Sequence, residues 1–400
     1  MLVVQKYGGT SVGNLERIEA VAQRVIQSAR AGHRLVVVVS AMSGVTNSLI
    51  EQAEYFSKNP DGRAMDMLLS SGERVTSALL SIALNEKGFK AVAFSGRNAG
   101  IKTDSVFTKA RIEHIDTGEI LRALQSDFIV IIAGFQGVDE EGRVTTLGRG
   151  GSDLSAVAVA GALGADLCEI YTDVDGVYTT DPRIEPKAKK LDKISYEEML
   201  ELASLGAKVL QNRSVELAKK LGVNLVTRSS FNNNEGTMIM KEDGMEKALV
   251  SGIALDKNQA RITLRNIEDR PGIAAEIFSA LAAQNINVDM IIQNVGLDGA
   301  TNLGFTVPEN ELDLAKNTLR EILGSRVVME SDSAVVKVSV VGVGMKSHSG
   351  VASQAFRALA TEGINIGMIS TSEIKISLIV HEKYGELAVR ALHEAYELDR

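Results

Sequence analysis

The chain has 400 residues, 45% apolar and 24% charged, so it is long enough for two or three globular domains and is neither disordered nor fibrous. Its net charge of −8 disfavours binding to nucleic acid. Apolar runs such as Leu35 to Val39 are far shorter than the ~20 residues of a membrane span, and the first residues do not read as a secretory signal. The single cysteine, Cys168, suits a reducing compartment, and we expect a cytoplasmic protein.

Apolar strands alternate with amphipathic helices in the first part of the chain. We predict strands at 2–5, 34–40, 91–94, 127–133, 166–172 and 224–227, and helices at 14–31, 66–84, 152–163, 196–202 and 207–221. Val-rich strands that alternate with helices are typical of parallel sheets buried on both faces. The expected fold class is therefore α/β, with a mainly parallel sheet sandwiched by helices.

The second part of the chain contains an internal duplication. A polar, turn-rich segment marks a domain boundary near 245, and beyond it Gly272 to Ile291 and Gly350 to Ile369 are identical at ten of twenty positions. Each copy reads strand, helix, strand, strand, helix, which predicts tandem βαββαβ units of ferredoxin-like type. We predict strands at 261–264, 287–292, 301–307, 335–341, 365–370 and 374–380, and helices from 272, at 311–323, from 350 and at 386–396.

The second copy has no sequence left for its closing strand. The apolar segment 248–255 would fill that gap if copy one were inserted inside copy two. We therefore expect a first domain at 1–244, the second repeat at 245–258 plus 334–400, and the first repeat at 259–333.

The first predicted strand leads into a glycine turn. In Lys6 to Gly13 (KYGGTSVG), consecutive glycines, a helix N-terminus and a lysine suit a phosphate group; the alternative is a tight turn with a solvated lysine. The chain has neither a G-x-x-x-x-G-K-[ST] motif nor a G-x-G-x-x-G after its first strand, which disfavours a P-loop or dinucleotide site.

Two later segments also follow predicted strands. In 145–153 (TTLGRGGSD), Arg149 lies between glycines, where its guanidinium suits a carboxylate, although Ser152 or Asp153 also suits a simple helix cap. The segment 171–183 (YTDVDGVYTTDPR) is either a nucleotide-facing loop or an ordinary acidic turn.

Together with SGER at 71–74, GFQG at 134–137 and LGAKVL at 205–210, these segments resemble the signature motifs of the aspartate kinase family, an amino-acid kinase fold followed by two ACT repeats. The resemblance runs from residue 3 to about 396. It implies transfer of the ATP γ-phosphoryl group to the side-chain carboxylate of L-aspartate, giving 4-phospho-L-aspartate, at the start of the lysine, threonine and methionine branch. A carboxylate is already ionised at neutral pH, so the transfer needs positioning and charge neutralisation and no general base.

The resemblance also implies residue roles. Lys6 would neutralise the phosphoryl group, Asp153 would orient Lys6, Arg149 would bind a carboxylate of aspartate and Glu73 its ammonium. For Glu73 the alternative is a surface carboxylate paired with Arg74 or Arg63. ATP-binding residues are expected at Lys6, Tyr7, Gly8, Gly9, Ser40, Thr172, Asp173, Tyr178, Arg183 and Lys208. Substrate-binding residues are expected at Thr46, Glu73, Arg149, Gly150, Gly151 and Ser152. Mg²⁺ is expected to bind through ATP oxygens, without a protein cage.

The ACT repeats resemble amino-acid sensors, which implies feedback regulation by lysine, threonine or both. Effector-binding residues are expected at Asp269, Gly272, Ile273, Ala274, Asn287, Asp289, Gln293, Ser372 and Glu373; the alternative is that these polar residues simply face solvent. We expect a homo-oligomer formed through the ACT repeats, and Met245 could start a separately translated regulatory chain.

Two rival functions fit parts of the sequence. A kinase of the same fold acting on glutamate, acetylglutamate or a nucleotide would not be expected to carry tandem ACT repeats. An amino-acid-binding regulator with an inactive kinase half would not need Lys6, Arg149 and Asp153 together. The chain departs from the family at Gln211 and Asn212, where His-Pro is frequent, and at Ser349, where proline is common.

Overall fold

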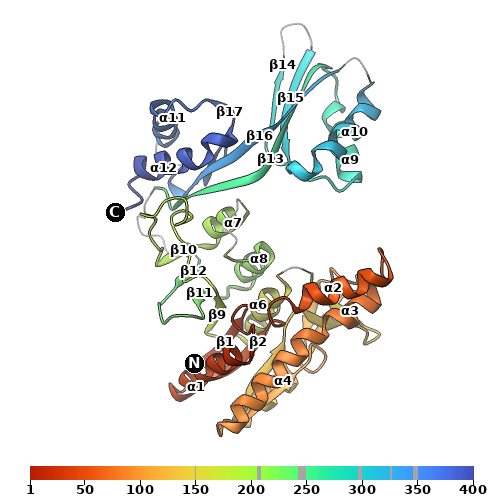
Figure 1. The fold of residues 1–400 in the computed structure, drawn as a ribbon, viewed down its shortest axis with the longest axis vertical. Helices are drawn as coiled ribbons and strands as arrows, with labels where there is room; N and C mark the ends of the chain where they lie inside the picture. The colour runs from red at the N-terminus through yellow and green to blue at the C-terminus, as the bar shows by residue number, and fades with distance from the viewer. Residues whose placement is uncertain (149, 205–208, 242–248, 296–299, 325–326, 346–349) are drawn as a thin grey trace. The chain divides into compact units, whose positions relative to one another are not determined.

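The computed structural model describes residues 1–400 except 149, 205–208, 242–248, 296–299, 325–326 and 346–349 (Figure 1). The chain forms two compact units. The first comprises Met1–Val177, Lys190–Ala203 and Lys208–Gly244, and the second comprises Tyr178–Lys189, Ser204–Ala207 and Met245–Arg400. Among the described residues, no helix has the length and apolar character needed to cross a membrane.

The first unit is built on an eight-stranded sheet with the order β10-β12-β11-β9-β1-β2-β6-β3. All neighbouring strands are parallel except the antiparallel pair β11 and β12, so the predicted parallel sheet is confirmed. The strands are β1 (Leu2–Tyr7), β2 (Arg34–Val39), β3 (Ala91–Phe94), β6 (Ile129–Ala133), β9 (Leu167–Thr172), β10 (Lys193–Ser195), β11 (Leu225–Ser229) and β12 (Thr237–Met240).

Helices pack on both faces of this sheet, as predicted. The described helices from residue 1 to 221 are α1 (Leu15–Arg30), α2 (Val45–Phe56), α3 (Gly62–Leu69), α4 (Ser71–Glu86), α5 (Gly118–Gln125), α6 (Gly151–Leu163), α7 (Tyr196–Ser204) and α8 (Asn212–Leu221). Side chains of α1 and α4 form one core cluster with alternate residues of β1 and β2, including Val3, Tyr7 and Val37. Because strand side chains alternate, Val4 and Lys6 point to the opposite face, where α6 contacts β1.

The predicted helix 66–84 is wrong as a single element. It consists of α3 and α4, separated at Ser70, whose carbonyl accepts hydrogen bonds from Arg74 Nε at 3.3 Å and from Gln136 Nε2 at 2.9 Å. Serine and glycine favour helix ends over helix interiors, so the Ser70-Ser71-Gly72 sequence is a natural place for this break. The predicted helix 207–221 begins as α8 only at Asn212.

A second, four-stranded sheet in the first unit was not predicted. Its order is β5-β4-β7-β8. The strands are β4 (Ile101–Thr103), β5 (Ile112–Ile115), β7 (Gln136–Val138) and β8 (Val144–Thr146). These strands have only three or four residues and, unlike β3, contain no continuous apolar run.

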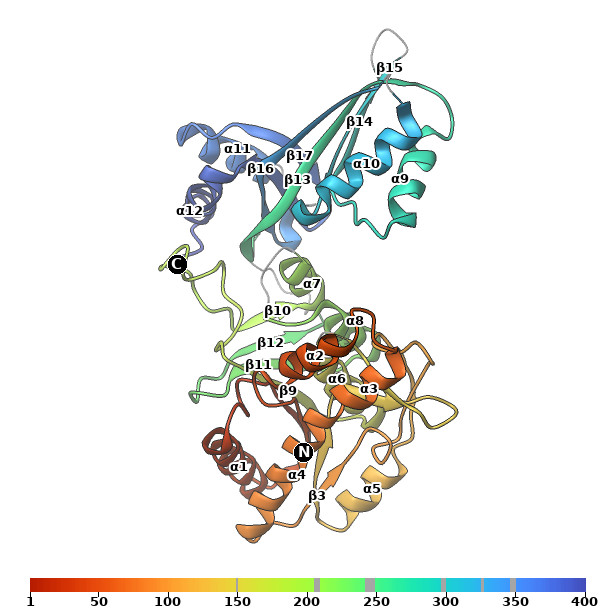
Figure 2. The same ribbon diagram turned by 45° about the vertical axis from the view of Figure 1, so that its right-hand side comes forward.

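The second unit contains a six-stranded antiparallel sheet with the order β14-β15-β13-β16-β18-β17 (Figure 2). Its strands are β13 (Gly252–Glu268), β14 (Ile291–Val295), β15 (Ala300–Val307), β16 (Val328–Val341), β17 (Ile366–Thr371) and β18 (Lys375–His381). Its helices are α9 (Ile273–Ala283), α10 (Leu312–Leu323), α11 (Val351–Thr361) and α12 (Gly385–Ala395), with short 3-10 turns η1 (Glu309–Glu311), η3 (Val343–Met345) and η4 (Glu382–Tyr384).

Two of the hydrophobic clusters on this sheet are core clusters formed with helices. One packs α9 and α10 on β13 and β15, and the other packs α11 and α12 on β16 and β18 (Figure 2). Residues 252–255 of the predicted segment 248–255 and the whole of the predicted strand 261–264 belong to the single long strand β13; residue 248 lies outside the described residues. Its first residues pair with the end of β16, from Gly252 opposite Val341 to Leu255 opposite Val338, and Ile253 lies in the core of α11 and α12. The strand predicted at 287–292 begins only at Ile291.

Candidate active site

The predicted phosphate-binding residues lie at the carboxyl edge of the parallel sheet. Strands β1, β2 and β9 are neighbours, with Tyr7 in register with Val39 and Tyr171. Their last residues therefore lead into adjacent loops. The Ser40 N–H donates to the Tyr7 carbonyl at 3.1 Å, and the Gly134 N–H donates to the Val39 carbonyl at 3.0 Å. In open α/β sheets this edge is the usual ligand crevice.

Lys6 is almost buried at this edge, with 8% of its surface exposed. Its Nζ lies 2.6 Å from Oδ1 of Asp153, in an ion pair. A Cβ on Gly8 would lie 3.2 Å from the same Nζ, so glycine keeps the space beside the ammonium open. The predicted orientation of Lys6 by Asp153 is thus matched by a direct contact.

Asp153 lies in the first turn of α6, whose N-terminus meets the ends of β6 and β1. Gly150 is the N-cap residue with φ 70°, and a Cβ on Gly134 would lie 3.0 Å from Cβ of Ser152. Only glycines permit this backbone and this approach. Gln211 lies against Gly150: a Cβ there would come 2.4 Å from its Cγ. The predicted Arg149 lies outside the described residues.

Glu73, in the first turn of α4, is buried with 4% of its surface exposed. Its Oε1 accepts a hydrogen bond from the Ala41 N–H at 3.1 Å, just beyond β2, while its buried Oε2 has no hydrogen-bond partner among the residues that the structure describes. Arg74 instead donates to the Ser70 carbonyl, so the alternative of a surface ion pair is wrong. Burial raises the pKa of Glu73 to about 7, against the lowering effect of the Ala41 hydrogen bond. A buried carboxylate with one unpartnered oxygen is suited to a cationic ligand group.

Other predicted site residues follow the same edge. Ser40 and Thr46 are half-buried, and Thr46 lies in the first turn of α2. Thr172 ends β9 and donates to Asp173 at 3.1 Å, with the Asp173 side chain exposed. The predicted Lys208 lies outside the described residues.

Tyr178 and Arg183 belong to the second unit, in the segment Tyr178–Lys189. Arg183 is exposed and pairs with Asp181 at 2.7 Å. The hydroxyl of Thr179, in the same segment, lies 2.9 Å from Nε2 of the buried His393 on α12. The segment is therefore attached to the core cluster that α11 and α12 form in that unit.

Two predicted contacts of the first glycine turn differ from the structure. The Tyr7 side chain is fully buried on the other face of the sheet, stacked on Tyr171 with ring centroids 4.6 Å apart, so it does not line the edge. Strand alternation, which directs Lys6 to one face, directs Tyr7 to the other. The Gly8 N–H donates to the Tyr171 carbonyl at 3.2 Å, a bond that must be exchanged before it can bind a phosphate.

The predicted effector residues lie at several places in the second unit. Asp269 precedes α9, whose N-cap is Gly272 with φ 94°; Ile273 and Ala274 form its first turn. Asn287 and Asp289 lie before β14 and not on it, Gln293 lies on β14, and Ser372 and Glu373 lie between β17 and β18. Asp289 is already paired with the buried Lys337 of β16.

Sequence reasoning did not single out Ser230, which joins the glycine turn to the end of β9. Its hydroxyl accepts from Ser11 Oγ at 2.8 Å, and its N–H donates to the Thr172 carbonyl at 2.9 Å. Arg17 Nη2 donates to the Ser230 carbonyl at 3.1 Å. A serine in a polar segment after β11 carries no sequence signal for such a role.

Comparison with known proteins places these features in a family. The model of the amino acid kinase family matches residues 1–228, and the ACT domain model matches residues 265–323 and 338–396. The aspartokinase of Helicobacter pylori is 62% identical over 405 residues, covering 100% of both chains, and that of Pseudomonas aeruginosa is 54% identical over 405 residues, covering 100% of this chain and 98% of the other.

Solved structures show the same relation. E. coli aspartokinase III in complex with aspartate and ADP, in the R-state, has a TM-score of 0.82 and 28% identity, covering 99% of each chain. The same enzyme in complex with lysine and aspartate, in the T-state, has a TM-score of 0.79 and 28% identity, covering 98% of this chain and 99% of the other.

Proposed function

Because the chain belongs to the aspartokinase family, we propose that it transfers the γ-phosphoryl group of ATP to the side-chain carboxylate of L-aspartate, giving 4-phospho-L-aspartate. One observation carries the proposal. The paired Lys6 and Asp153 and the half-partnered Glu73 are buried near one edge of one sheet, in a single compact unit. That edge offers a cation to a phosphoryl group and an anion to an amino group.

The proposed mechanism rests on charge and position. The acceptor carboxylate is ionised, so the chain has no proton to remove from it. Asp153 holds the Lys6 ammonium at the edge, where it neutralises charge on the γ-phosphoryl oxygens as the bond to ADP breaks. Glu73 binds the ammonium of aspartate through its free oxygen, and Arg149 binds a carboxylate. Thr46, Ser40 and the α6 residues Gly151 and Ser152, with Gly150 before them, complete the acceptor site.

Nucleotide binding is proposed for Lys6, Gly8, Gly9, Ser40, Thr172, Asp173, Tyr178, Arg183 and Lys208. Among the described residues, no group of three or more His, Cys, Asp or Glu side chains is arranged to hold a metal ion. Mg²⁺ typically keeps several waters and is held largely by substrate phosphates, so we propose that it binds mainly through ATP oxygens, without a protein cage. When bound, the ion would neutralise phosphate charge that Lys6 does not reach.

An acceptor panel tests the proposed reaction. With ATP and Mg²⁺, hydroxylamine traps an acyl phosphate as a hydroxamate, and we expect product with aspartate and none with glutamate or acetylglutamate. Turnover with another acceptor supports the rival kinase, and no turnover with any acceptor supports the inactive regulator.

We further propose that lysine, threonine or both inhibit the enzyme through the ACT repeats. The domain layout proposed for this regulation is 1–244, then 245–258 plus 334–400 around the inserted 259–333, supported by the pairing of Gly252–Leu255 with β16. The segment that carries Tyr178 and Arg183 packs with the second ACT core through Thr179 and His393. An effector that favours another arrangement of the ACT sheet would thereby alter a nucleotide-binding segment.

Added effectors test this regulation in the same assay. We expect lysine, threonine or their mixture to lower the rate and to raise the KM for ATP. Unchanged rates with either amino acid and with both would contradict it.

Assembly is proposed to use the ACT sheet. Its edge strands β14 and β17 expose Ile291 and Ile369, at 49% and 41%, which suits burial against another copy. Sedimentation of a monomer with and without lysine would contradict a homo-oligomer.

Met245, the proposed alternative start, lies outside the described residues. A cytoplasmic location agrees with the proposed function.

A further inference from the structure

Asp66, on α3, is fully buried, and within the described part of the chain its carboxylate forms no ion pair. Both of its oxygens accept a hydrogen bond from the Thr108 N–H at 3.0 Å. The Thr146 N–H donates to Oδ2 at 3.0 Å, and the Thr146 hydroxyl donates to Oδ1 at 2.6 Å. Burial raises the pKa of Asp66 in spite of these bonds. A buried carboxylate is costly, so the contacts that it makes require an explanation beyond packing.

On one side, Asp66 holds the strand that leads into the glycine loop. Thr146 ends β8, and Gly148 follows two residues later with φ 77°. Thr108, the other partner of Asp66, touches this loop, since a Cβ on Gly148 would lie 3.3 Å from the Thr108 carbonyl oxygen. Asp66 therefore fixes both the start of the loop and the backbone against which it rests.

On the other side, Asp66 belongs to the helix pair that carries Glu73. Only Ser70 separates α3 from α4, and the Gln136 side chain binds its carbonyl at 2.9 Å. Glu73 lies in the first turn of α4. All these residues lie in the first unit.

We propose that Asp66 is a positioning residue for the acceptor substrate: it sets the separation between Glu73, which binds the ammonium of aspartate, and the loop from Gly148 to Ser152, which binds its carboxylate end. The inference rests on the proposed function. A displacement of about 1 Å in such a pair costs on the order of 100-fold in rate. Aspartate recognition, and not nucleotide binding, is therefore the property that Asp66 controls.

Kinetics of Asp66→Asn, Asp66→Ala and Thr146→Val in the full chain test the proposal. The asparagine keeps the shape of the side chain but turns an NH₂ group toward a backbone N–H, the alanine removes every bond, and the valine removes only the hydroxyl bond. We expect the KM for aspartate to rise about tenfold for Asp66→Asn and Thr146→Val and about 100-fold for Asp66→Ala, with the KM for ATP changed less than about twofold. Calorimetric titration with aspartate should show the same order of affinities.

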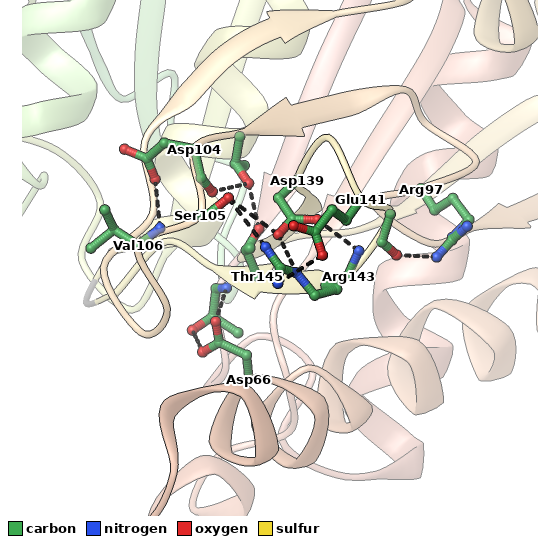
Figure 3. A network of polar contacts seen from close by, with 12 residues as sticks. Asp66, Arg97, Asp104, Ser105, Val106, Asp139, Glu141, Arg143 and Thr145 are labelled. Atoms are coloured by element: carbon green, nitrogen blue, oxygen red, sulfur yellow. Dashed lines mark hydrogen bonds and ion pairs between the residues drawn. The ribbon is translucent and has the colours of Figure 1, made fainter.

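Asp139→Asn is the matched control. Asp139 is also buried, at 1% exposure, but it binds Arg143 at 2.7 Å within the β7–β8 hairpin and does not reach α3 (Figure 3). We expect both KM values to stay within about twofold of the original chain.

Two results would overturn the inference: equal increases in the KM for aspartate and for ATP, or an Asp66→Asn variant that behaves like Asp139→Asn. If Asp66→Ala does not fold, the asparagine and valine variants decide. Absence of turnover with aspartate in the unsubstituted chain would instead overturn the proposed function. Calorimetric titration of the unsubstituted chain with aspartate distinguishes failure of the proposed function from failure of the Asp66 inference.

Discussion

Lys6→Ala is expected to lower kcat by about a thousandfold or more while the protein stays folded and still binds aspartate. Lys6 provides the buried cation at the edge of the sheet, 2.6 Å from Asp153. Removing one group that stabilises transition-state charge typically costs 10²–10³-fold, and losing a cation from phosphoryl transfer costs about 10³–10⁵-fold. Steady-state kinetics with ATP and aspartate, together with circular dichroism and aspartate titration, measure these effects.

Two further variants separate charge from packing. Lys87→Ala removes a lysine that pairs with Glu19 at 2.6 Å on the surface of the same unit, and it should leave kcat unchanged. The double change Lys6→Ala and Asp153→Ala removes both members of the buried pair, so it leaves no unpaired carboxylate. It should fold and remain inactive. An active double variant would show that the pair has no catalytic role.

Glu73→Gln is expected to raise the KM for aspartate at least about 30-fold. Truncating one partner of a buried charge pair costs about 2–5 kcal/mol, and each 1.4 kcal/mol is tenfold in affinity. The KM for ATP should change little, because the predicted nucleotide residues do not include Glu73. Initial rates with one substrate varied at a time measure both constants.

The pH dependence of the two proteins should differ as well. The pKa of Glu73 is raised to about 7 in the folded chain, and aspartate's ammonium binds the ionised form. In the unsubstituted chain, kcat/KM for aspartate should therefore fall about tenfold per pH unit below pH 7. Glu73→Gln has no carboxyl group at this position, so the fall of kcat/KM below pH 7 should be absent. If the variant still shows this fall, another group is responsible for it.

The same raised pKa affects stability. Below the unfolded pKa of 4.5, Glu73 is protonated in both states. Between pH 4.5 and 7 the Glu73 carboxyl is ionised in the unfolded chain but still protonated in the folded chain. The free energy of unfolding therefore falls as pH rises through this range, and the total loss, complete at about pH 7, is about 3 kcal/mol. Urea unfolding should show the stability of the original chain relative to Glu73→Gln falling between pH 4.5 and 7 and levelling off above that range. Glu169→Gln is the control for the pH dependence of activity. It changes a buried glutamate that accepts a hydrogen bond from Gln5 at 2.8 Å on the same sheet, and the fall of kcat/KM for aspartate below pH 7 should remain in this variant.

Much of the fold could be predicted from the sequence because its long elements have clear periods. The Val-rich strands β1 and β2, the helix α1 and the repeat of α9 in α11 all appear where expected. The small sheet of β4, β5, β7 and β8 has no such signal. The long β13 was divided into two strands because its middle, from Asp256 to Gln259, is polar and contains irregular pairing with β16. The end of α3 at Ser70 depends on tertiary hydrogen bonds that a helical pattern does not reveal.

Site residues that belong to a sequence motif could be predicted, and those whose position depends on tertiary packing could not. The contact of Lys6 with Asp153 was expected from two motifs far apart in the sequence. The burial of Glu73, by contrast, follows from where α4 docks at the end of β2, and no local pattern shows it. Asp66 and Ser230 make several of their hydrogen bonds with backbone groups, and such bonds have no sequence signature. Tyr7 was misplaced because a motif was read without the alternation of its strand.

The most direct test of the proposed reaction is the origin of one oxygen atom. When aspartate carrying oxygen-18 in its side-chain carboxylate reacts with ATP in the presence of hydroxylamine, the nitrogen attacks the acyl carbon and phosphate leaves with the bridging oxygen. We predict that the released phosphate carries the label, and that label in the α-carboxylate stays in the amino acid. Unlabelled phosphate from the side-chain-labelled substrate would contradict transfer to that carboxylate.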